Sequence, residues 1–178
     1  MSNKKTILWI IGFLIILILL ISFPIVYSYL SDADKINNQF SIGGNKIELI
    51  EDFEPPEELL PGTIFTKDIK VKNIGENDCY IRIKAVFSNS DIGNYCTIDF
   101  NTTDYEYNSE DGYYYYKNKL NIGEISPSLF TTVSISDEIP EFEIQDFNIL
   151  VYAESIQYDG FTDYKDAWNN YQRNKNQE

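Results

Sequence analysis

The chain has no histidine at all, and it has only one methionine and two cysteines among its 178 residues. Without histidine it cannot form a Ser-His-Asp or Cys-His catalytic arrangement or an HExxH zinc motif. It also lacks the side chain that usually titrates near neutral pH. An all-carboxylate metal site or a carboxylate-pair hydrolase is the enzymatic alternative that this absence leaves open. With 28 acidic residues, many carboxylates lie close together by chance, so no pair stands out as catalytic. We therefore expect no enzyme activity, no catalytic residue and no resident cofactor.

Basic residues are scarce, with 14 lysines and arginines against 28 aspartates and glutamates. All the acidic residues and 12 of the basic ones lie beyond residue 28, so residues 29–178 carry a net charge of −16. A surface of this sign repels nucleic acid and anionic lipid head groups. Neither is therefore an expected partner of the chain.

One long apolar run occurs, and it lies at the N-terminus. Two lysines precede it, residues 7–21 contain no polar side chain, and Pro24 interrupts it near its end. About 20 apolar residues can span a bilayer, whereas a positive start and a proline break before small residues are typical of a signal peptide. We therefore expect residues 1–28 to be a signal peptide or membrane anchor and residues 29–178 to be one exported domain. The chain would then be secreted or held at the cell surface, and would touch a membrane only through this segment.

Short strand-like runs separated by turn residues fill most of the exported part. Apolar and polar residues alternate at period two in most runs, and Gly, Pro, Asn and Asp gather between them. The even spacing of short strands predicts an all-β fold, namely a jelly-roll-like antiparallel β-sandwich. The expected strands lie in residues 38–52, 63–73, 79–87, 96–107, 113–116, 129–139 and 147–158.

Two pairs of runs predict local strand pairing. Residues 63–73 and 79–87 are joined by a short turn, so we expect an antiparallel hairpin. The odd-numbered residues of 79–87 should face the core, and the even-numbered ones should face outward. Residues 38–52 predict two more short strands on either side of a Gly43-Gly44 turn.

One short helix is expected near the C-terminus, over residues 162–172, with Thr162 or Asp163 as its N-cap. Its aromatic residues fall on one face. Acidic residues here and near position 32 could bind calcium, but neither stretch has the spacing of an EF-hand loop, and the helix N-terminus explains two of them. The residues concerned are Asp32, Asp34, Asp159, Asp163 and Asp166.

The two cysteines open successive strand-like runs. Cys79 begins one run and Cys96 begins the next, so the two side chains could face each other. In an exported chain such a pair could form a disulfide. Two buried free thiols are the alternative.

Tyrosines gather around a turn in the middle of the chain. The run Tyr113 to Tyr116 returns from this turn, opposite Tyr105 and Tyr107. Exposed tyrosines beside acidic residues can stack on sugars, so Tyr105, Tyr107, Tyr113 and Tyr115 are candidates for a face that binds a glycan or a host protein. The alternative is that tyrosine suits a half-buried sheet, where successive side chains point to opposite faces.

Several stretches resemble the TasA/camelysin group, which comprises exported proteins of Gram-positive bacteria that rely on the SipW type of signal peptidase. After the long apolar segment these stretches are SYLSDADKINNQFSIG, VKNIGENDCYIRI, DGYYYY, LNIGEISPSLF and YAESIQYDGF. The resemblance covers essentially the whole chain, and its motifs are mostly turns and strands.

The resemblance implies a jelly-roll β-sandwich, secretion through that peptidase, and assembly into extracellular fibres of a biofilm matrix. Its partners would be further copies of the chain or related matrix proteins. Camelysin-like members are described as metalloproteases. This sequence has no histidine and no zinc motif, so we do not carry that activity over, and no catalytic residue can be matched.

The segment that follows the apolar run has the features of a polymerisation strand. Residues 29–43 begin polar and then alternate at Gln39, Phe40, Ser41 and Ile42. Because two glycines join this segment to the rest, it could leave its own sheet and add to the edge of a neighbouring copy. Repeated head to tail, this contact gives a filament. The alternative is that the strand pairs within its own domain and the protein is a monomer.

We predict that signal peptidase cuts the chain after Ser28, because Val26 and Ser28 are acceptable residues at positions −3 and −1. Intact-mass analysis of extracellular protein should then show Tyr29 as the first residue. Cleavage after Ala33 is the alternative. A chain that begins at Met1 in the membrane fraction would identify an anchor instead.

Overall fold

The structure is a computed structural model that describes residues 39–41, 45–56, 58–140 and 147–175. The described residues all lie in one compact unit, residues 37–178. The segment 1–28, which we expect to direct export, lies outside them.

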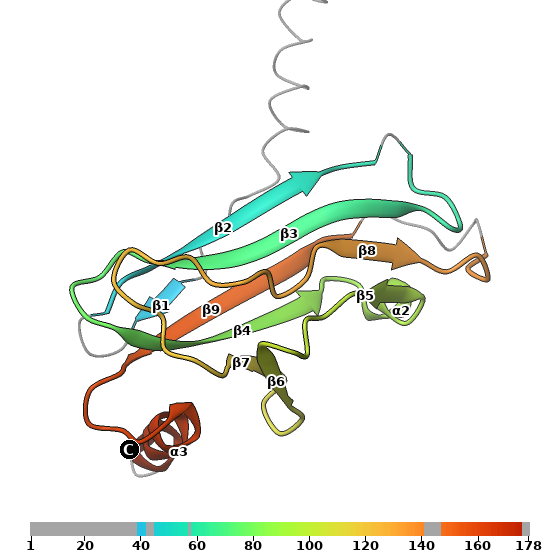
Figure 1. Ribbon diagram of the computed structural model, residues 1–178. Helices are drawn as coiled ribbons and strands as arrows, with labels where there is room; N and C mark the ends of the chain where they lie inside the picture. Colours follow the sequence, from blue (N-terminus) through green and yellow to red (C-terminus); the bar gives the residue numbers. More distant parts are fainter. Residues whose placement is uncertain (1–38, 42–44, 57, 141–146, 176–178) are drawn as a thin grey trace, which may run out of the picture. The chain divides into compact units, whose positions relative to one another are not determined.

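Two β-sheets form the body of this unit (Figure 1). One sheet has the strand order β1-β9-β4-β7-β6, and the other has the order β2-β3-β8-β5. Every pair is antiparallel except β1 and β9, which run parallel. The all-β class and the short C-terminal helix are thereby confirmed. The elements are β1 (Gln39–Ser41), β2 (Ile47–Glu54), β3 (Ile64–Asn73), β4 (Cys79–Phe87), α2 (Ser90–Gly93), β5 (Cys96–Ile98), β6 (Tyr105–Asn108), β7 (Tyr113–Tyr116), β8 (Thr132–Ile135), β9 (Ile149–Gln157) and α3 (Tyr164–Lys175).

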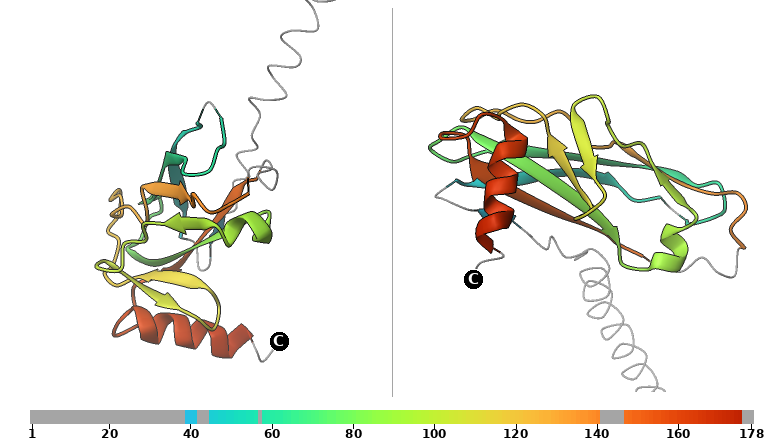
Figure 2. Two further views of the ribbon diagram at one scale, coloured as in Figure 1. Left: turned by 90° about the vertical axis from the view of Figure 1, so that its right-hand side faces the viewer. Right: turned by 90° about the horizontal axis from the view of Figure 1, so that it is seen from below.

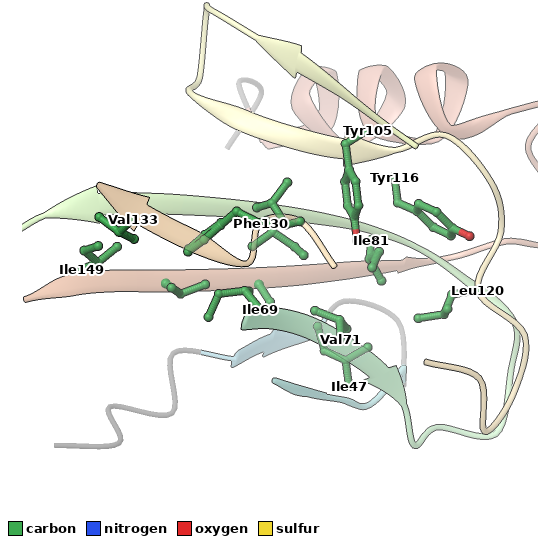
Figure 3. Packing of buried hydrophobic residues seen from close by; sticks show 14 of the residues in the cluster. Ile47, Ile69, Val71, Ile81, Tyr105, Tyr116, Leu120, Phe130, Val133 and Ile149 are labelled. Carbon is green, nitrogen blue, oxygen red and sulfur yellow. The ribbon is translucent and has the colours of Figure 1, made fainter. Parts of the chain in front are cut away.

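The two sheets enclose one hydrophobic core, to which both contribute alternate side chains (Figure 3). Ile69 and Val71 of β3 share this core with Ile81 and Ile83 of β4, and all four side chains have no exposed surface. The alternation in residues 79–87 therefore identifies the core-facing side of β4 correctly. Burying such side chains contributes about 1.5–3 kcal/mol each relative to leaving them in water.

The predicted hairpin of residues 63–73 and 79–87 is wrong, because β3 and β4 lie in different sheets. The buried side chain of Asn73 explains the arrangement. Its Nδ2 donates to the carbonyls of Asn77 (2.8 Å) and Leu120 (3.1 Å), and its Oδ1 accepts from the Gly75 amide (3.0 Å). These bonds hold the connection as an arch that carries the chain from one sheet to the other, in place of a tight turn.

The two short strands expected in residues 38–52 are present as β1 and β2, and they pair with β9 and with β3. One other expectation about the strands is wrong. Residues 96–107 contain two strands in different sheets, β5 and β6, where one was expected. The Asp99 carboxylate follows β5 and accepts from the amides of Thr131 (2.9 Å) and Thr132 (2.7 Å). This contact turns the chain away from its sheet.

Helix α3 packs beside β6 and β7, on the outer face of the five-stranded sheet (Figure 2). The Asp163 carboxylate accepts from the Asp166 amide (2.9 Å), so Asp163 is the N-cap. Tyr164, Trp168 and Tyr171 share one face and contact the sheet, as the spacing predicts. Because α3 covers this face, the even-numbered side of β4 is partly buried and not wholly outward.

Candidate functional site

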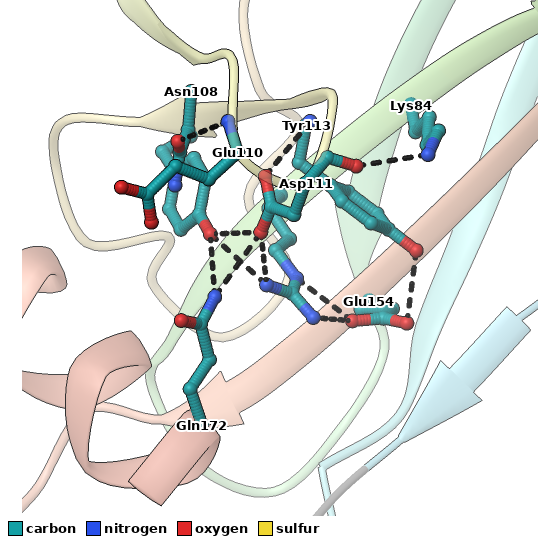
Figure 4. Close-up of polar contacts among 9 residues, drawn as sticks. Lys84, Asn108, Glu110, Asp111, Tyr113, Glu154 and Gln172 are labelled. Atoms are coloured by element: carbon teal, nitrogen blue, oxygen red, sulfur yellow. Dashed lines mark hydrogen bonds and ion pairs between the residues drawn. The ribbon is translucent and has the colours of Figure 1, made fainter.

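A cluster of charged and aromatic side chains lies between the five-stranded sheet and α3; Figure 4 shows Asp111, Glu154 and Gln172 among its polar residues. Arg82 is its centre, because its guanidinium binds both Asp111 and Glu154. Arg82 occupies the side of β4 that faces away from the core, yet only 5 % of its surface is exposed. Strand register places Glu154 of β9 and Tyr115 of β7 directly beside it. The site is therefore built by three adjacent strands, and α3 closes it.

Two carboxylates and a phenol bind the Arg82 guanidinium. Its Nε and Nη2 donate to Glu154 Oε2 at 2.8 and 2.5 Å. Its Nη1 donates to Asp111 Oδ2 and to the Tyr115 hydroxyl, both at 3.0 Å. Charge-assisted hydrogen bonds of this kind are among the stronger ones in proteins.

Aromatic rings flank the same guanidinium. The Arg82 Cζ lies 4.2 Å from the ring centroid of Tyr113 and 4.3 Å from that of Trp168. Tyr115 and Tyr171 lie further away, at 5.6 and 5.7 Å. Cation–π contacts at these distances are favourable, and more so when water is excluded. Because Trp168 and Tyr171 belong to α3, the charge on β4 holds the helix on the sheet.

Three further hydrogen bonds connect the polar side chains of the cluster. Tyr113 donates to Glu154 Oε1 (3.0 Å), Tyr115 donates to Asp111 Oδ2 (2.5 Å), and Gln172 Nε2 of α3 donates to the same Asp111 oxygen (3.2 Å). The indole Nε1 of Trp168 is buried without a hydrogen-bond partner. The cluster thus has little left with which to bind a substrate.

The electrostatics agree with a structural role. Burial lowers the pKa of the Arg82 guanidinium, but the charge and hydrogen bond of Glu154 outweigh burial, so that this pKa is raised. Burial raises the pKa of Tyr113, and the negative charge of Glu154 raises it further. The raised pKa of Arg82 keeps its guanidinium charged, so it is a permanent cation that joins α3 to the sheet.

Sequence analysis alone did not identify this cluster. Glu154 is the single charged residue of the strand ILVYAESIQ, and Arg82 is one of two basic residues, with Lys84, in the strand CYIRIKAVF. A charge in such a mostly apolar strand is a signal that a partner must lie nearby, since burying it unpaired is costly. Only the register of β4 against β9 shows that the two charges meet.

The four tyrosines predicted to share a binding face point to opposite sides of their sheet. Tyr105 is 1 % exposed and contributes to the core between the sheets, with its hydroxyl 2.8 Å from the Pro127 carbonyl. Tyr107 lies on the same side of β6, whereas Tyr113 and Tyr115 face α3. The proposed single face is therefore corrected, because β6 and β7 pair Tyr105 with Tyr116 and Tyr107 with Tyr114.

A smaller aromatic stack remains at the rim of the sandwich. Tyr107, which is 52 % exposed, contacts the ring of Tyr114 with centroids 4.8 Å apart. Tyr114 in turn stacks on Phe100 at 4.2 Å, and Phe100 contacts Phe130 in the core. An exposed ring is thus connected to the core by continuous aromatic packing.

The two cysteines are free thiols, so of the two alternatives the possible disulfide is not formed. Cys79 begins β4 in one sheet, and Cys96 begins β5 in the other, after the chain has run the length of β4. Nine strand residues span roughly 30 Å, far beyond the reach of a disulfide. Burial raises the pKa of the Cys79 thiol to about 12, so this thiol is unreactive at neutral pH.

The residues predicted to polymerise form part of strand β1. Gln39, Phe40 and Ser41 pair with Ala153, Glu154 and Ser155 of β9 in the same chain. Ile42 lies outside the described residues, as do the two residues of the predicted cleavage site, Ser28 and Tyr29.

Within the described residues, no group of three or more His, Cys, Asp or Glu side chains is placed to hold a metal ion. Of the calcium candidates, Asp163 and Asp166 bind the backbone at the start of α3, and Asp32 and Asp34 lie outside the described part. None of the helices that the structure describes is long and apolar enough to cross a membrane.

Comparison of the chain with protein-family models, with curated proteins and with solved structures finds no match. The resemblance to the TasA/camelysin group therefore stays a prediction from the quoted sequence stretches.

We predict that Arg82→Met destabilises the domain by about 3–5 kcal/mol, because Glu154 and Asp111 lose their buried counter-charge. A urea titration followed by tryptophan fluorescence measures this directly, since Trp168 is the one tryptophan in residues 29–178. Lys165→Met is the matched control, because its pair with Glu106 is exposed and should contribute little. Equal losses in the two variants would contradict the role given to Arg82.

We also predict that the domain unfolds between about pH 10 and about pH 12. Tyrosines in an unfolded chain titrate near pH 10, whereas burial raises the pKa of Tyr164 in the folded domain to about 12, with its hydrogen bond to Glu106 adding to the effect. A raised folded-state pKa gives stability that is present below the unfolded value and is lost as the pH rises through the folded one. Burial raises the pKa of six other tyrosines, namely Tyr80, Tyr105, Tyr113, Tyr114, Tyr115 and Tyr116.

The measurement is tyrosinate absorbance recorded together with circular dichroism across this pH range. Absorbance should rise as the β signal is lost. Full ionisation near pH 10 with the fold intact would refute the prediction.

Proposed function

We propose that the chain is a secreted, non-enzymatic structural protein that polymerises into extracellular matrix fibres of the biofilm type through strand β1. The apolar N-terminal segment supports export, and the sequence stretches that resemble the TasA/camelysin group support the fibre class. The localisation that follows is the extracellular matrix or the cell surface, with a membrane anchor if the segment is not removed.

The order of the strands supports a jelly roll as the finer architecture. Consecutive strands pass repeatedly from one sheet to the other, as β3 to β4, β4 to β5 and β5 to β6 do. Each sheet consequently interleaves strands from both halves of the sequence, with β9 beside β4 and β8 between β3 and β5. Such crossings are characteristic of double Greek-key sandwiches.

The main observation in support of the fibre proposal is that the outer edge of β9 is only partly paired. Strand β9 has nine residues, but β1 pairs with only Ala153, Glu154 and Ser155. Among the described residues, no strand pairs with the outer edge of residues 149–152. A sheet edge with unpaired backbone groups is a template for another strand.

Exchange of β1 between copies would use this edge. The strand is short, it lies at the margin of the sheet, and it is joined to β2 through a glycine pair. The first strand of a neighbouring copy could take its place beside β9 and recover the same backbone hydrogen bonds. Each copy would place its β1 on one neighbour and receive the β1 of another. Because these are two different surfaces, the contact does not close on itself and a filament grows.

A second candidate function is a surface module that binds a glycan or a host protein. The exposed ring of Tyr107, backed by Tyr114 and Phe100, is the feature that favours it. Rigid aromatic surface of this kind is typical of binding sites. A glycan array with wild type and Tyr107→Ala tests it, since a binding module should lose its signal on that substitution.

We predict that residues 29–178 form filaments visible by electron microscopy, and that residues 46–178, which lack β1, do not. Phe40→Pro in the full segment should behave like the truncation, because proline removes the backbone donor of the pairing strand. A synthetic peptide of residues 29–45 should compete with donation between copies and shorten the filaments.

The outcomes separate the alternatives. Identical filaments from residues 46–178 would show that β1 is not the connector. Absence of filaments from residues 29–178 under all conditions would reject the fibre proposal in favour of the binding module.

A further inference from the structure

Tyr107 is the most exposed tyrosine that the structure describes, with 52 % of its surface open to solvent. The other tyrosines of the described residues are buried or half-buried. Tyr107 belongs to β6, which is the last strand in the order of the five-stranded sheet. Among the described residues, its phenol is therefore the one that a second protein molecule reaches most readily.

The side chains that usually compete with tyrosine for oxidants are missing or shielded. The chain has no histidine, and its single methionine is Met1. Trp168 is 1 % exposed, and Cys79 has no exposed surface. Cys96 is half-buried, and burial raises the pKa of its thiol. Oxidation of sulfur follows exposure and thiolate character, so a one-electron oxidant at the surface of the described residues finds Tyr107 as its main target.

The ring of Tyr107 is fixed from its own side of the hairpin. It contacts the ring of Tyr114 with centroids 4.8 Å apart, and Tyr114 stacks on Phe100 at 4.2 Å. Tyr107 and Tyr114 lie directly opposite each other in β6 and β7, where Cβ atoms are about 4.5–5.5 Å apart. Two phenol rings joined edge to edge need a wider separation of their Cβ atoms. The geometry therefore favours coupling of Tyr107 to another molecule over coupling to Tyr114.

We propose that Tyr107 is an oxidative cross-linking site at which two copies of this chain are joined by a dityrosine bond. The co-reactant is a one-electron oxidant supplied from outside the chain, of the class formed by a peroxidase with hydrogen peroxide. This modification goes beyond the fibre function and does not depend on it, because two copies that meet in solution can couple through the same ring.

The reaction balances as a two-electron oxidation of two phenols. Hydrogen peroxide takes one electron and one proton from each Tyr107, which gives two phenoxyl radicals and two molecules of water. The radicals combine by forming a bond between the ring carbons next to their oxygens. Each of these carbons then loses its proton and each oxygen regains one, so that both aromatic rings are restored. The product lacks the two hydrogen atoms that reduced the peroxide.

Residues 29–178 carrying Tyr29→Phe test the reaction, because Tyr29 lies outside the described residues. The protein is treated with a peroxidase and hydrogen peroxide and is then separated on a reducing gel. We expect a covalent dimer with dityrosine fluorescence as the main product, since each copy offers one readily reached phenol. Reduction removes any disulfide dimer formed through Cys96 but leaves the dityrosine dimer intact.

Two variants of this protein locate the bond. Tyr107→Phe should lose nearly all of the reduction-resistant dimer, because phenylalanine keeps the ring contact with Tyr114 but has no phenol hydrogen to give up. Tyr152→Phe is the matched control, since Tyr152 is a half-buried tyrosine of β9, and its dimer yield should equal that of the parent. Peptide mapping of the dimer should find Tyr107 of one copy bonded to Tyr107 of the other. Circular dichroism confirms that each variant is folded.

A dimer yield that Tyr107→Phe leaves unchanged would overturn the inference, as would a cross-link mapped to Tyr107 and Tyr114 within one chain. Absence of any dimer under conditions that couple free N-acetyltyrosine would also reject it. Filament formation is scored without oxidant, so failure of the cross-link and failure of the fibre proposal are distinguishable.

Discussion

The arch between β3 and β4 is the constraint on which the rest of the structure depends. Asn73 holds it with three hydrogen bonds from one buried side chain, and so the chain crosses from one sheet to the other where a hairpin would have kept it in the same sheet. The apolar sides of β3 and β4 consequently share the core between the sheets. Leaving any of the three bonded groups buried and unpaired would cost about 1–3 kcal/mol. The same arch leaves the other side of β4 free for α3.

The Arg82 cluster shows how a small all-β domain orders a terminal helix. A helix of 12 residues is marginal by itself in water. It is held here by burial of Trp168 against the sheet. The Arg82 guanidinium also holds it, because this group contacts the Trp168 ring of the helix and the carboxylates of Asp111 and Glu154. A buried ion cluster contributes less net stability than its contacts suggest, because desolvation opposes it, but it disfavours other packings of the helix. Its position also explains why tyrosines surround Arg82, since a ring supplies both an apolar face and a hydroxyl.

The edges of the sandwich differ in how well they are protected. Strand β6 carries Glu106, which binds Tyr164 and Lys165 of α3, so the helix protects that side of its sheet. At the other side of this sheet, the described residues that pair with the outer edge of β9 are the three residues of β1. Long exposed edges are usually blocked by charge, proline or cover, and an edge covered by a detachable strand is suited to controlled assembly.

The sequence alone determined the strand class, the core-facing side of β4, and a C-terminal helix at the position of α3 with Thr162 or Asp163 as its cap, because alternation and capping are local consequences of side-chain chemistry. It did not determine which strands pair. Residues 63–73 and 79–87 alternate as cleanly as a hairpin would, yet their apolar sides can be buried either in one sheet or in two facing sheets. The tertiary structure decided this through Asn73, whose partners at Asn77 and Leu120 include one that is distant in sequence. The meeting of Arg82 with Glu154, the opposite directions of Tyr105 and Tyr113, and the separation of Cys79 from Cys96 all follow from that decision. Each depends on strand register between segments far apart in the chain, which no local pattern of residues specifies.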